Sequence, residues 1–148
     1  DLAVCMGNSL SLLNTEQDLR AAFARVQERL LSGGLFLFQI LNYARPAAQE
    51  PRQRIERRTL PEGNLIAVKN LVPEGEHTLL ALNFFVEGEG GRFEASVDTA
   101  VLRNWSVEAL VEAAGEAGLT AAELFGGFDR APYDASVSPD LIGLFEKE

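Results

Sequence analysis

The chain has 148 residues, of which 47% are hydrophobic, enough for one globular domain with a core of its own. Its formal net charge of −9 argues against nucleic acid and against an anionic membrane surface as partners. Cys5 and His77 are the only cysteine and histidine, so no internal disulfide can form and no metal site is predicted. No run reaches the roughly 18 apolar residues of a membrane span. The first residues do not form a signal segment, which favours a cytoplasmic protein.

The beginning of the chain predicts a strand followed by a helix. Residues 2–6 are apolar and predict a short buried strand, which ends in a polar turn formed by Gly7, Asn8 and Ser9. Thr15 is the expected N-cap of a helix over residues 16–31, with Asp18 in a capping-box-like position. Apolar residues then recur at spacings of three and four, which is typical of an amphipathic helix.

A second strand is predicted directly after this helix. Gly33 and Gly34 can adopt the positive φ that ends a helix. Residues 35–41 are apolar except for Gln39 and do not alternate, which favours a strand covered on both faces, as in a parallel sheet. A buried helix is the alternative, but seven residues are short for one. Strand, helix and strand together form a βαβ unit.

The pattern changes in residues 46–102, where turn signals that contain Gly and Pro separate short strands. These predict an antiparallel sheet, separate from the parallel one, inserted over the carboxyl edge or at a subunit contact. The expected strands are residues 54–60, 64–72, 77–86 and 92–102, and the expected turns are 61–63, 73–75 and 88–91.

An α/β pattern returns in residues 103–148. Trp105 is expected in the core, Ser106 caps a helix, and Gly118 ends it. Strands are predicted at residues 119–125 and 141–145, on either side of a loop. The fold class is therefore α/β, with residues 1–45 and 103–148 forming one sheet and its helices, and residues 46–102 an antiparallel β insertion.

Polar residues at the carboxyl ends of the first two strands form the candidate site, because ligands of open α/β sheets bind at that edge. The side-chain amides of Gln39 and Asn42 must be hydrogen-bonded if they are buried, and the partner is either the substrate or another group of the protein. Arg45 begins an arginine-rich segment that either binds an anionic group or forms a solvated strand face. The candidate substrate-binding residues are Ser9, Gln39, Asn42, Tyr43 and Arg45.

Three segments resemble class I S-adenosylmethionine-dependent methyltransferases, in particular glycine N-methyltransferase-like members. Residues 1–10, which contain Cys-Met-Gly-Asn-Ser, resemble the fourth strand and its turn. Residues 30–37, Leu-Leu-Ser-Gly-Gly-Leu-Phe-Leu, resemble the segment that enters the fifth strand. Residues 108–119, which contain Glu-Ala-Gly-Leu, resemble the late helix. The resemblance implies the C-terminal part of a Rossmann-like sheet, in the strand order 2–6, 35–41, 141–145, 119–125, with residues 141–145 antiparallel to their neighbours.

The resemblance also implies a cofactor, S-adenosyl-L-methionine, and a small-molecule methyl acceptor. Met6, Gly7 and Asn8 would contact the cofactor, with Asn8 and Ser9 facing the active site. No catalytic residue is identified, since direct in-line methyl transfer depends mainly on positioning. The family's glycine-rich loop is absent from this sequence. Leu41 stands where glycine N-methyltransferases have an arginine for the substrate carboxylate, which argues against an amino-acid substrate.

The first residues look like the interior of a strand, so we expect the chain to be a portion of a longer protein and inactive by itself. The outer edge of residues 2–6 should then be covered by upstream residues or by a second copy in a homodimer. The alternative function is a non-catalytic, truncated or degenerate module that acts in oligomer assembly. A nucleotide-dependent enzyme on another doubly wound fold is a third hypothesis.

Overall fold

The computed structural model describes residues 1–61 and 63–148 and divides into two compact units. The first unit contains Asp1–Gln49 and Arg103–Glu148, and the second contains Glu50–Leu102. Of the residues described, none belongs to a helix that is both long enough and apolar enough to cross a membrane.

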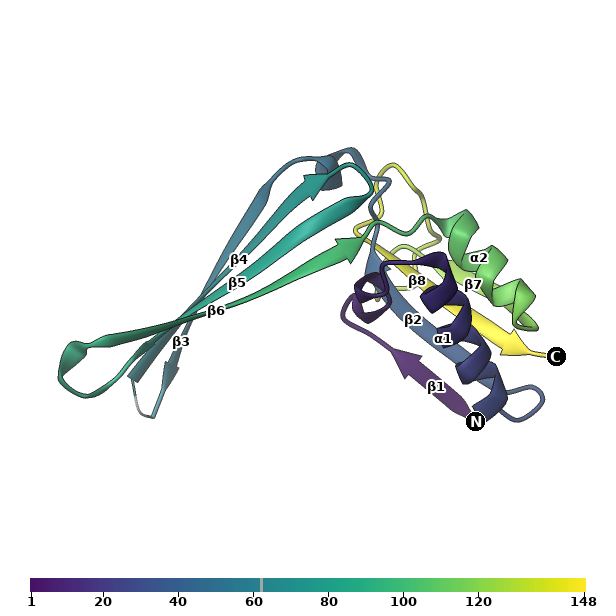
Figure 1. Ribbon diagram of the computed structural model, residues 1–148, viewed down its shortest axis with the longest axis horizontal. Helices are drawn as coiled ribbons and strands as arrows, with labels where there is room; N and C mark the ends of the chain where they lie inside the picture. The colour runs from purple at the N-terminus through teal and green to yellow at the C-terminus, as the bar shows by residue number, and fades with distance from the viewer. Residues whose placement is uncertain (62) are drawn as a thin grey trace. The chain divides into compact units, whose positions relative to one another are not determined.

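The sheet of the first unit has four strands in the order β1-β2-β8-β7 (Figure 1). β1 (Leu2–Cys5) and β2 (Leu35–Leu41) are parallel. β8 (Asp140–Lys147) lies between β2 and β7 (Leu119–Phe125) and is antiparallel to both. The predicted strand order and the antiparallel last strand are therefore confirmed.

Two helices belong to this unit, α1 (Glu16–Arg29) and α2 (Val107–Glu116), and both N-caps are the predicted residues. The Thr15 hydroxyl accepts a hydrogen bond from the Asp18 amide at 3.1 Å, and the Ser106 hydroxyl accepts one from the Ala109 amide at 3.2 Å. α1 ends two residues before the expected boundary because Leu30 adopts an extended conformation with ψ 145°. The described residues of this unit also form two short 3₁₀ helices, η1 (Ser9–Leu12) and η2 (Pro46–Gln49), and those of the second unit form η3 (Glu89–Gly91).

Four phenylalanines form the centre of the core of the first unit. Phe23 of α1 makes edge-to-face contacts with Phe36, Phe38 and Phe145, at centroid distances of 5.6, 6.3 and 6.2 Å. Gly143 of β8 leaves room for these rings, because a Cβ atom there would lie 2.6 Å from the Phe38 ring. Trp105 is buried as expected, and its indole donates hydrogen bonds to the carbonyls of Leu10 and Leu13 at 3.2 and 3.1 Å.

The expectation that the first strand is buried is wrong. Leu2 and Val4 are 57% and 54% exposed, whereas Ala3 and Cys5 pack partly against the core. β1 is the edge strand of its sheet. Exposed and partly buried residues alternate along it because one of its faces is not covered. Cys5 is therefore half-buried rather than a core residue, and the burial it has raises the pKa of its thiol.

The second unit is a four-stranded sheet in the order β3-β4-β5-β6. β3 (Arg52–Leu60), β4 (Gly63–Glu74) and β5 (His77–Glu87) are successively antiparallel, and β6 (Phe93–Arg103) lies beside β5. The prediction of a separate antiparallel sheet is confirmed.

One predicted turn of this unit is shorter than expected. Pro73 and Glu74 were expected in a turn but extend β4, so only two residues join β4 to β5. The turn predicted at residues 61–63 includes Glu62, which lies outside the described residues.

Candidate functional site

The predicted cofactor turn follows the carboxyl end of β1 and is fastened to β2 by its backbone. The Asn8 amide donates to the Gln39 carbonyl at 3.2 Å, and the Gly7 amide donates to Gln39 Oε1 at 2.9 Å. Gly7 and Asn8 have φ of 73° and 71°, in the left-handed region that glycine and asparagine adopt most readily. These two residue types are therefore required by the turn itself.

The Asn8 side chain links the turn to the end of β2. Its Oδ1 accepts a hydrogen bond from the Leu41 amide at 2.7 Å, and its Nδ2 donates to the Tyr43 hydroxyl at 3.0 Å. That hydroxyl donates in turn to Ser11 Oγ at 3.0 Å. The Leu41 amide can only donate, so Asn8 Oδ1 must accept and Asn8 Nδ2 must donate. This fixes the direction of each hydrogen bond from Leu41 through Asn8 and Tyr43 to Ser11. Tyr43 and Ser11 are both buried, so the Tyr43 hydroxyl is committed to partners inside the protein.

Gln39 is oriented by a carboxylate that the sequence did not single out. Its Nε2 donates to Asp140 Oδ1 at 2.7 Å, and a carboxylate oxygen only accepts, so Oε1 is left to receive the Gly7 amide. Asp140 is the first residue of β8, opposite Leu41 in the strand register. Its only signal in the sequence is that it starts the last apolar run.

Asn42 belongs to a different cluster from the other predicted residues. It is buried, and its Nδ2 donates to the carbonyls of Ala135 and Ser138 at 2.9 Å each. Its Oδ1 accepts from the Ala44 amide at 3.1 Å and from the Tyr133 hydroxyl at 2.9 Å. Asn42 therefore holds the loop that joins β7 to β8.

The structure thus joins Gly7, Asn8, Gln39 and Tyr43 in one hydrogen-bond network. The remaining predicted residues lie outside that network. Met6 is half-buried, and Ser9 is exposed with its hydroxyl donating to the Met6 carbonyl at 2.8 Å. Arg45 is half-buried, and its Nε has no hydrogen-bond partner among the described residues.

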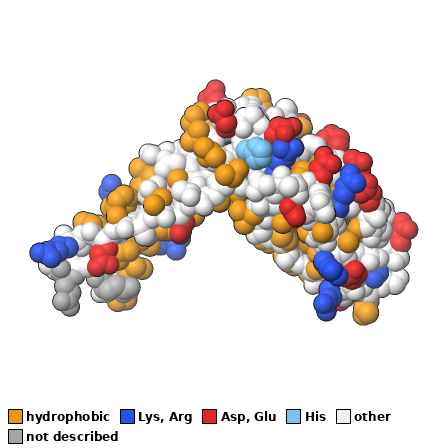
Figure 2. Space-filling view, viewed as in Figure 1, with side chains coloured by type: hydrophobic (Ala, Val, Ile, Leu, Met, Phe, Trp, Pro, Cys, Tyr) orange, Lys and Arg blue, Asp and Glu red, His pale blue; other side chains and the backbone are white. Residues whose placement is uncertain are grey.

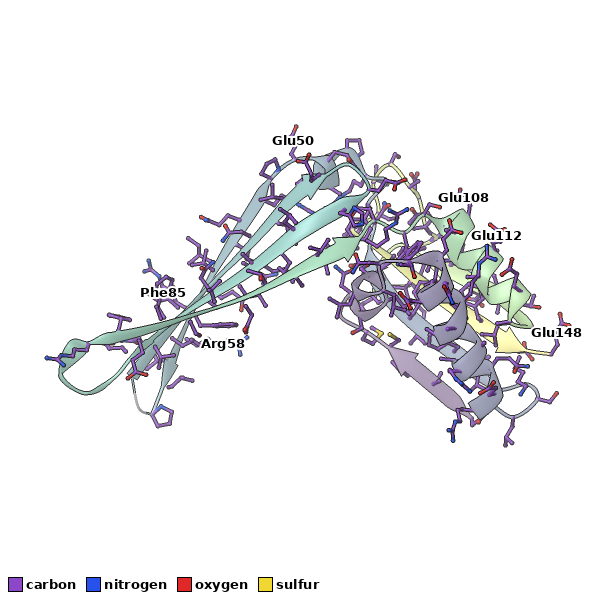
Figure 3. The ribbon with its side chains drawn as sticks, in the orientation of Figure 1. Glu50, Arg58, Phe85, Glu108, Glu112 and Glu148 are labelled. Carbon is purple, nitrogen blue, oxygen red and sulfur yellow. The ribbon has the colours of Figure 1, made fainter. Side chains whose placement is uncertain are left out.

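Burial and, to a smaller extent, two nearby carboxylates shift the pKa of Tyr133. Burial raises the pKa of the Tyr133 hydroxyl, and the negative charges of Glu108 and Asp134 raise it further. Hydrogen bonds from the Ser136 side chain and backbone hold the pKa of Asp134 below its ordinary value. Glu108 projects from the first turn of α2, where its own backbone amide and Ser106 lower its pKa (Figure 3).

The raised pKa of Tyr133 predicts a loss of stability at high pH. The folded protein binds the phenolic proton more tightly than the unfolded chain, whose tyrosine pKa is about 10. This contribution is therefore complete below about pH 10 and is lost as pH rises through the pKa of the folded state. Urea unfolding between pH 8 and pH 11.5 should show a falling free energy of unfolding, with a flatter profile in Tyr133→Phe. The Cys5→Ala variant separates the thiol contribution, which begins near pH 9. An unchanged slope in Tyr133→Phe would contradict the assignment.

Comparison with known proteins identifies the fold. No protein-family model and no curated protein sequence matches the chain. Among solved structures, a S-adenosylmethionine-dependent methyltransferase from Clostridium acetobutylicum matches 99% of this chain with a TM-score of 0.79 and 17% identity, over 58% of its own length. The sugar N-methyltransferase KedS8 from a Streptoalloteichus species matches 99% with a TM-score of 0.77 and 13% identity, over 56% of its length.

A third structure, the amino pentose methyltransferase CalS10 from Micromonospora echinaspora, was solved with S-adenosylmethionine bound. It matches 99% of this chain with a TM-score of 0.72 and 16% identity, over 58% of its own length. The chain spans less than three fifths of the length of each of these proteins. The predicted fold class is therefore confirmed: the chain folds as a large part of a S-adenosylmethionine-dependent methyltransferase does.

Proposed function

We propose that the chain is the C-terminal portion of a S-adenosylmethionine-dependent methyltransferase that acts on a small molecule. The observation that carries this proposal is the fold match over 99% of the chain, which includes both the sheet and the antiparallel insertion. The sequence resemblance, which rests on residues 1–10, 30–37 and 108–119 taken together, supports it independently.

The turn has room for a cofactor beside it. A Cβ atom built on Gly7 would meet no atom within 4 Å, so the space over this backbone is open. We propose that Met6, Gly7 and Asn8 border the cofactor, which would supply an electrophilic methyl group. The residues of this chain would act by positioning: Gln39 and Asp140 hold the Gly7 amide, and the Asn8 side chain holds the end of β2 at Leu41. A rigid edge of this kind favours in-line transfer, because the reacting atoms must be aligned.

The acceptor we propose is an amine on a sugar-like small molecule. Two of the matched proteins are described as methyltransferases of an amino pentose and of a sugar nitrogen. The presence of Leu41 in place of an arginine leaves an amino-acid carboxylate without that partner. Ser9, which is exposed, and Arg45, which is half-buried, remain candidates for contact with the acceptor.

The experiment that tests the proposal measures methyl transfer by the protein encoded by the complete gene, from radiolabelled S-adenosylmethionine to a panel of amino sugars, with glycine as the comparison. We expect transfer to an amino sugar, and we expect Asn8→Ala to impair transfer more than it impairs folding. Tyr43→Phe is the matched control, because it removes the Asn8–Tyr43 hydrogen bond and leaves the turn unchanged. Equal losses in the two variants would reduce Asn8 to a structural role.

The 148-residue chain alone should bind S-adenosylmethionine only at about millimolar concentration or not at all, because half a site lacks preorganisation. Calorimetry showing micromolar affinity would contradict this prediction. Absence of methyl transfer and of cofactor binding in the complete protein would instead favour the non-catalytic module in oligomer assembly.

A further inference from the structure

The carboxylate of Asp140 and the side-chain amide of Gln39 meet on one face of the first sheet. Gln39 of β2 lies opposite Ile142 of β8, and Asp140 is two residues before Ile142. Side chains two residues apart on a strand point to the same face, so Asp140 and Gln39 are diagonal neighbours across the two strands. Long side chains can bridge such a diagonal, and Gln39 Nε2 donates to Asp140 Oδ1 at 2.7 Å.

The Gln39 amide has two orientations of almost the same shape, which exchange its oxygen and its NH₂ group. In the observed orientation, Oε1 accepts a hydrogen bond from the Gly7 amide at 2.9 Å. In the reversed orientation, the NH₂ group would face the Gly7 N–H and the oxygen would face the Asp140 carboxylate, so both contacts would be repulsive. Gln39 is only 9% exposed, and water could compensate little of that loss. Asp140 therefore keeps Gln39 in the orientation that holds the turn at Gly7.

The Asp140 carboxylate projects from a fixed backbone. The Asp140 amide donates to the Gly126 carbonyl at 3.1 Å, and the carbonyl of the preceding Pro139 accepts from the Asn42 amide at 3.3 Å. The start of β8 is therefore held by the residue that follows β7 and by the residue that follows β2. A group supported in this way by strands can orient its neighbours more precisely than a group on a loop.

We propose that Asp140 is a positioning residue for methyl transfer, which sets the affinity for S-adenosylmethionine through Gln39 and the Gly7 backbone. The inference rests on the proposed function, because it takes the turn at Gly7 as the border of the cofactor site. It specifies the chemistry that residue 140 requires, which is a group that accepts a hydrogen bond from Gln39 when residue 39 is an amide.

Calorimetric titration of the protein encoded by the complete gene with S-adenosylmethionine tests the proposal. Asp140→Ala should raise the Kd by about 10-fold, because the Gln39 amide loses the bond that keeps it in place. Gln39→Glu should raise the Kd by at least about as much, because two carboxylates then face each other.

A double variant, Gln39→Glu with Asp140→Asn, tests the direction of the hydrogen bonds. The introduced glutamate accepts from the Gly7 amide and from the NH₂ group of the introduced asparagine, and the pair keeps a single negative charge. The Kd should therefore return to within about threefold of the value for the unmodified protein, although the harmful substitution is still present.

Glu146→Ala is the matched control, because it removes the same charge from the same face of β8 at an exposed position. Figure 2 shows other acidic side chains spread over the visible surface of the first unit, so the loss of one exposed carboxylate changes the field there little. We expect Glu146→Ala to change the Kd by less than about twofold.

The outcomes separate this inference from the proposed function. If the unmodified protein does not bind S-adenosylmethionine, the proposed function is wrong and the inference fails with it. If it binds, two results overturn the inference alone: a Kd that Asp140→Ala leaves unchanged while the free energy of unfolding falls, or a double variant that binds no better than Gln39→Glu. Circular dichroism establishes that each variant is folded. If a single variant does not fold, the double variant decides, because it must fold and bind within about threefold of the unmodified protein.

Discussion

Replacing Phe23 by alanine is expected to lower the free energy of unfolding by about 3–5 kcal/mol, more than any other change considered. Phe23 is only 1% exposed, and its ring contacts three others at centroid distances of 5.6–6.3 Å. The substitution removes the ring together with its edge-to-face contacts and leaves a cavity between α1 and the sheet. Urea unfolding followed by circular dichroism measures the loss.

Phe128→Ala is the matched control, because Phe128 belongs to the same unit and is 72% exposed. We expect it to change the free energy of unfolding by less than about 0.5 kcal/mol. Similar losses in the two variants would show that the four-ring cluster is not the centre of the core.

The second large effect is expected for Asn42→Ala, which should cost about 3 kcal/mol. The Asn42 amide is 2% exposed and bridges the end of β2 to the carbonyls of Ala135 and Ser138. Its removal leaves these carbonyls and the Ala44 amide without this partner. The bond to the Ser138 carbonyl is fully buried, and an unsatisfied buried group costs about 1–3 kcal/mol. Hydrogen exchange of residues 134–138 should rise along with the loss of stability.

Asn14→Ala, in which the replaced side chain is exposed, should cost less than about 1 kcal/mol. Unchanged exchange in Asn42→Ala would contradict the bridging role.

The sequence predicted the parts of the fold that local chemistry determines. Thr15 and Ser106 cap their helices because each hydroxyl accepts from an amide three residues ahead, an interaction that needs no tertiary structure. The exposure of β1 could not be predicted in this way. An apolar run is the same in a central strand and in an edge strand, and only the pairing decides whether both of its faces are covered.

Pro73 shows how pairing also overrides a turn signal. A proline is excluded from a central strand because it cannot donate a hydrogen bond. β3 begins at Arg52, which pairs with Leu71, so β4 has no neighbour on that side at Pro73. The strand can therefore continue through the proline and pair with Thr78 on the other side.

For the candidate site, the sequence singled out the residues that form the network, Gly7, Asn8, Gln39 and Tyr43, but also four that lie outside it, and it did not predict what any of them would bond to. Gln39 finds its carboxylate 101 residues further along the chain, and Asn42 finds its carbonyls more than 90 residues away. A spacing pattern contains no information on such distant partners. Only the structure therefore shows that the Tyr43 hydroxyl bonds to Asn8 and Ser11, and that Asp140 orients Gln39.

The position of β8 has a consequence for the order in which the chain folds. The strand that completes the first sheet is the last one in sequence, and it inserts between β2 and β7. During synthesis, the second sheet can close early because its neighbouring strands follow one another along the chain. The edge of β2, in contrast, stays open for about a hundred residues, and non-local pairing of this kind is slow. A nascent chain that pauses before Asp140 would present the apolar strand Leu35–Leu41 with one edge free, which makes that interval the time of greatest risk for aggregation and for capture by chaperones.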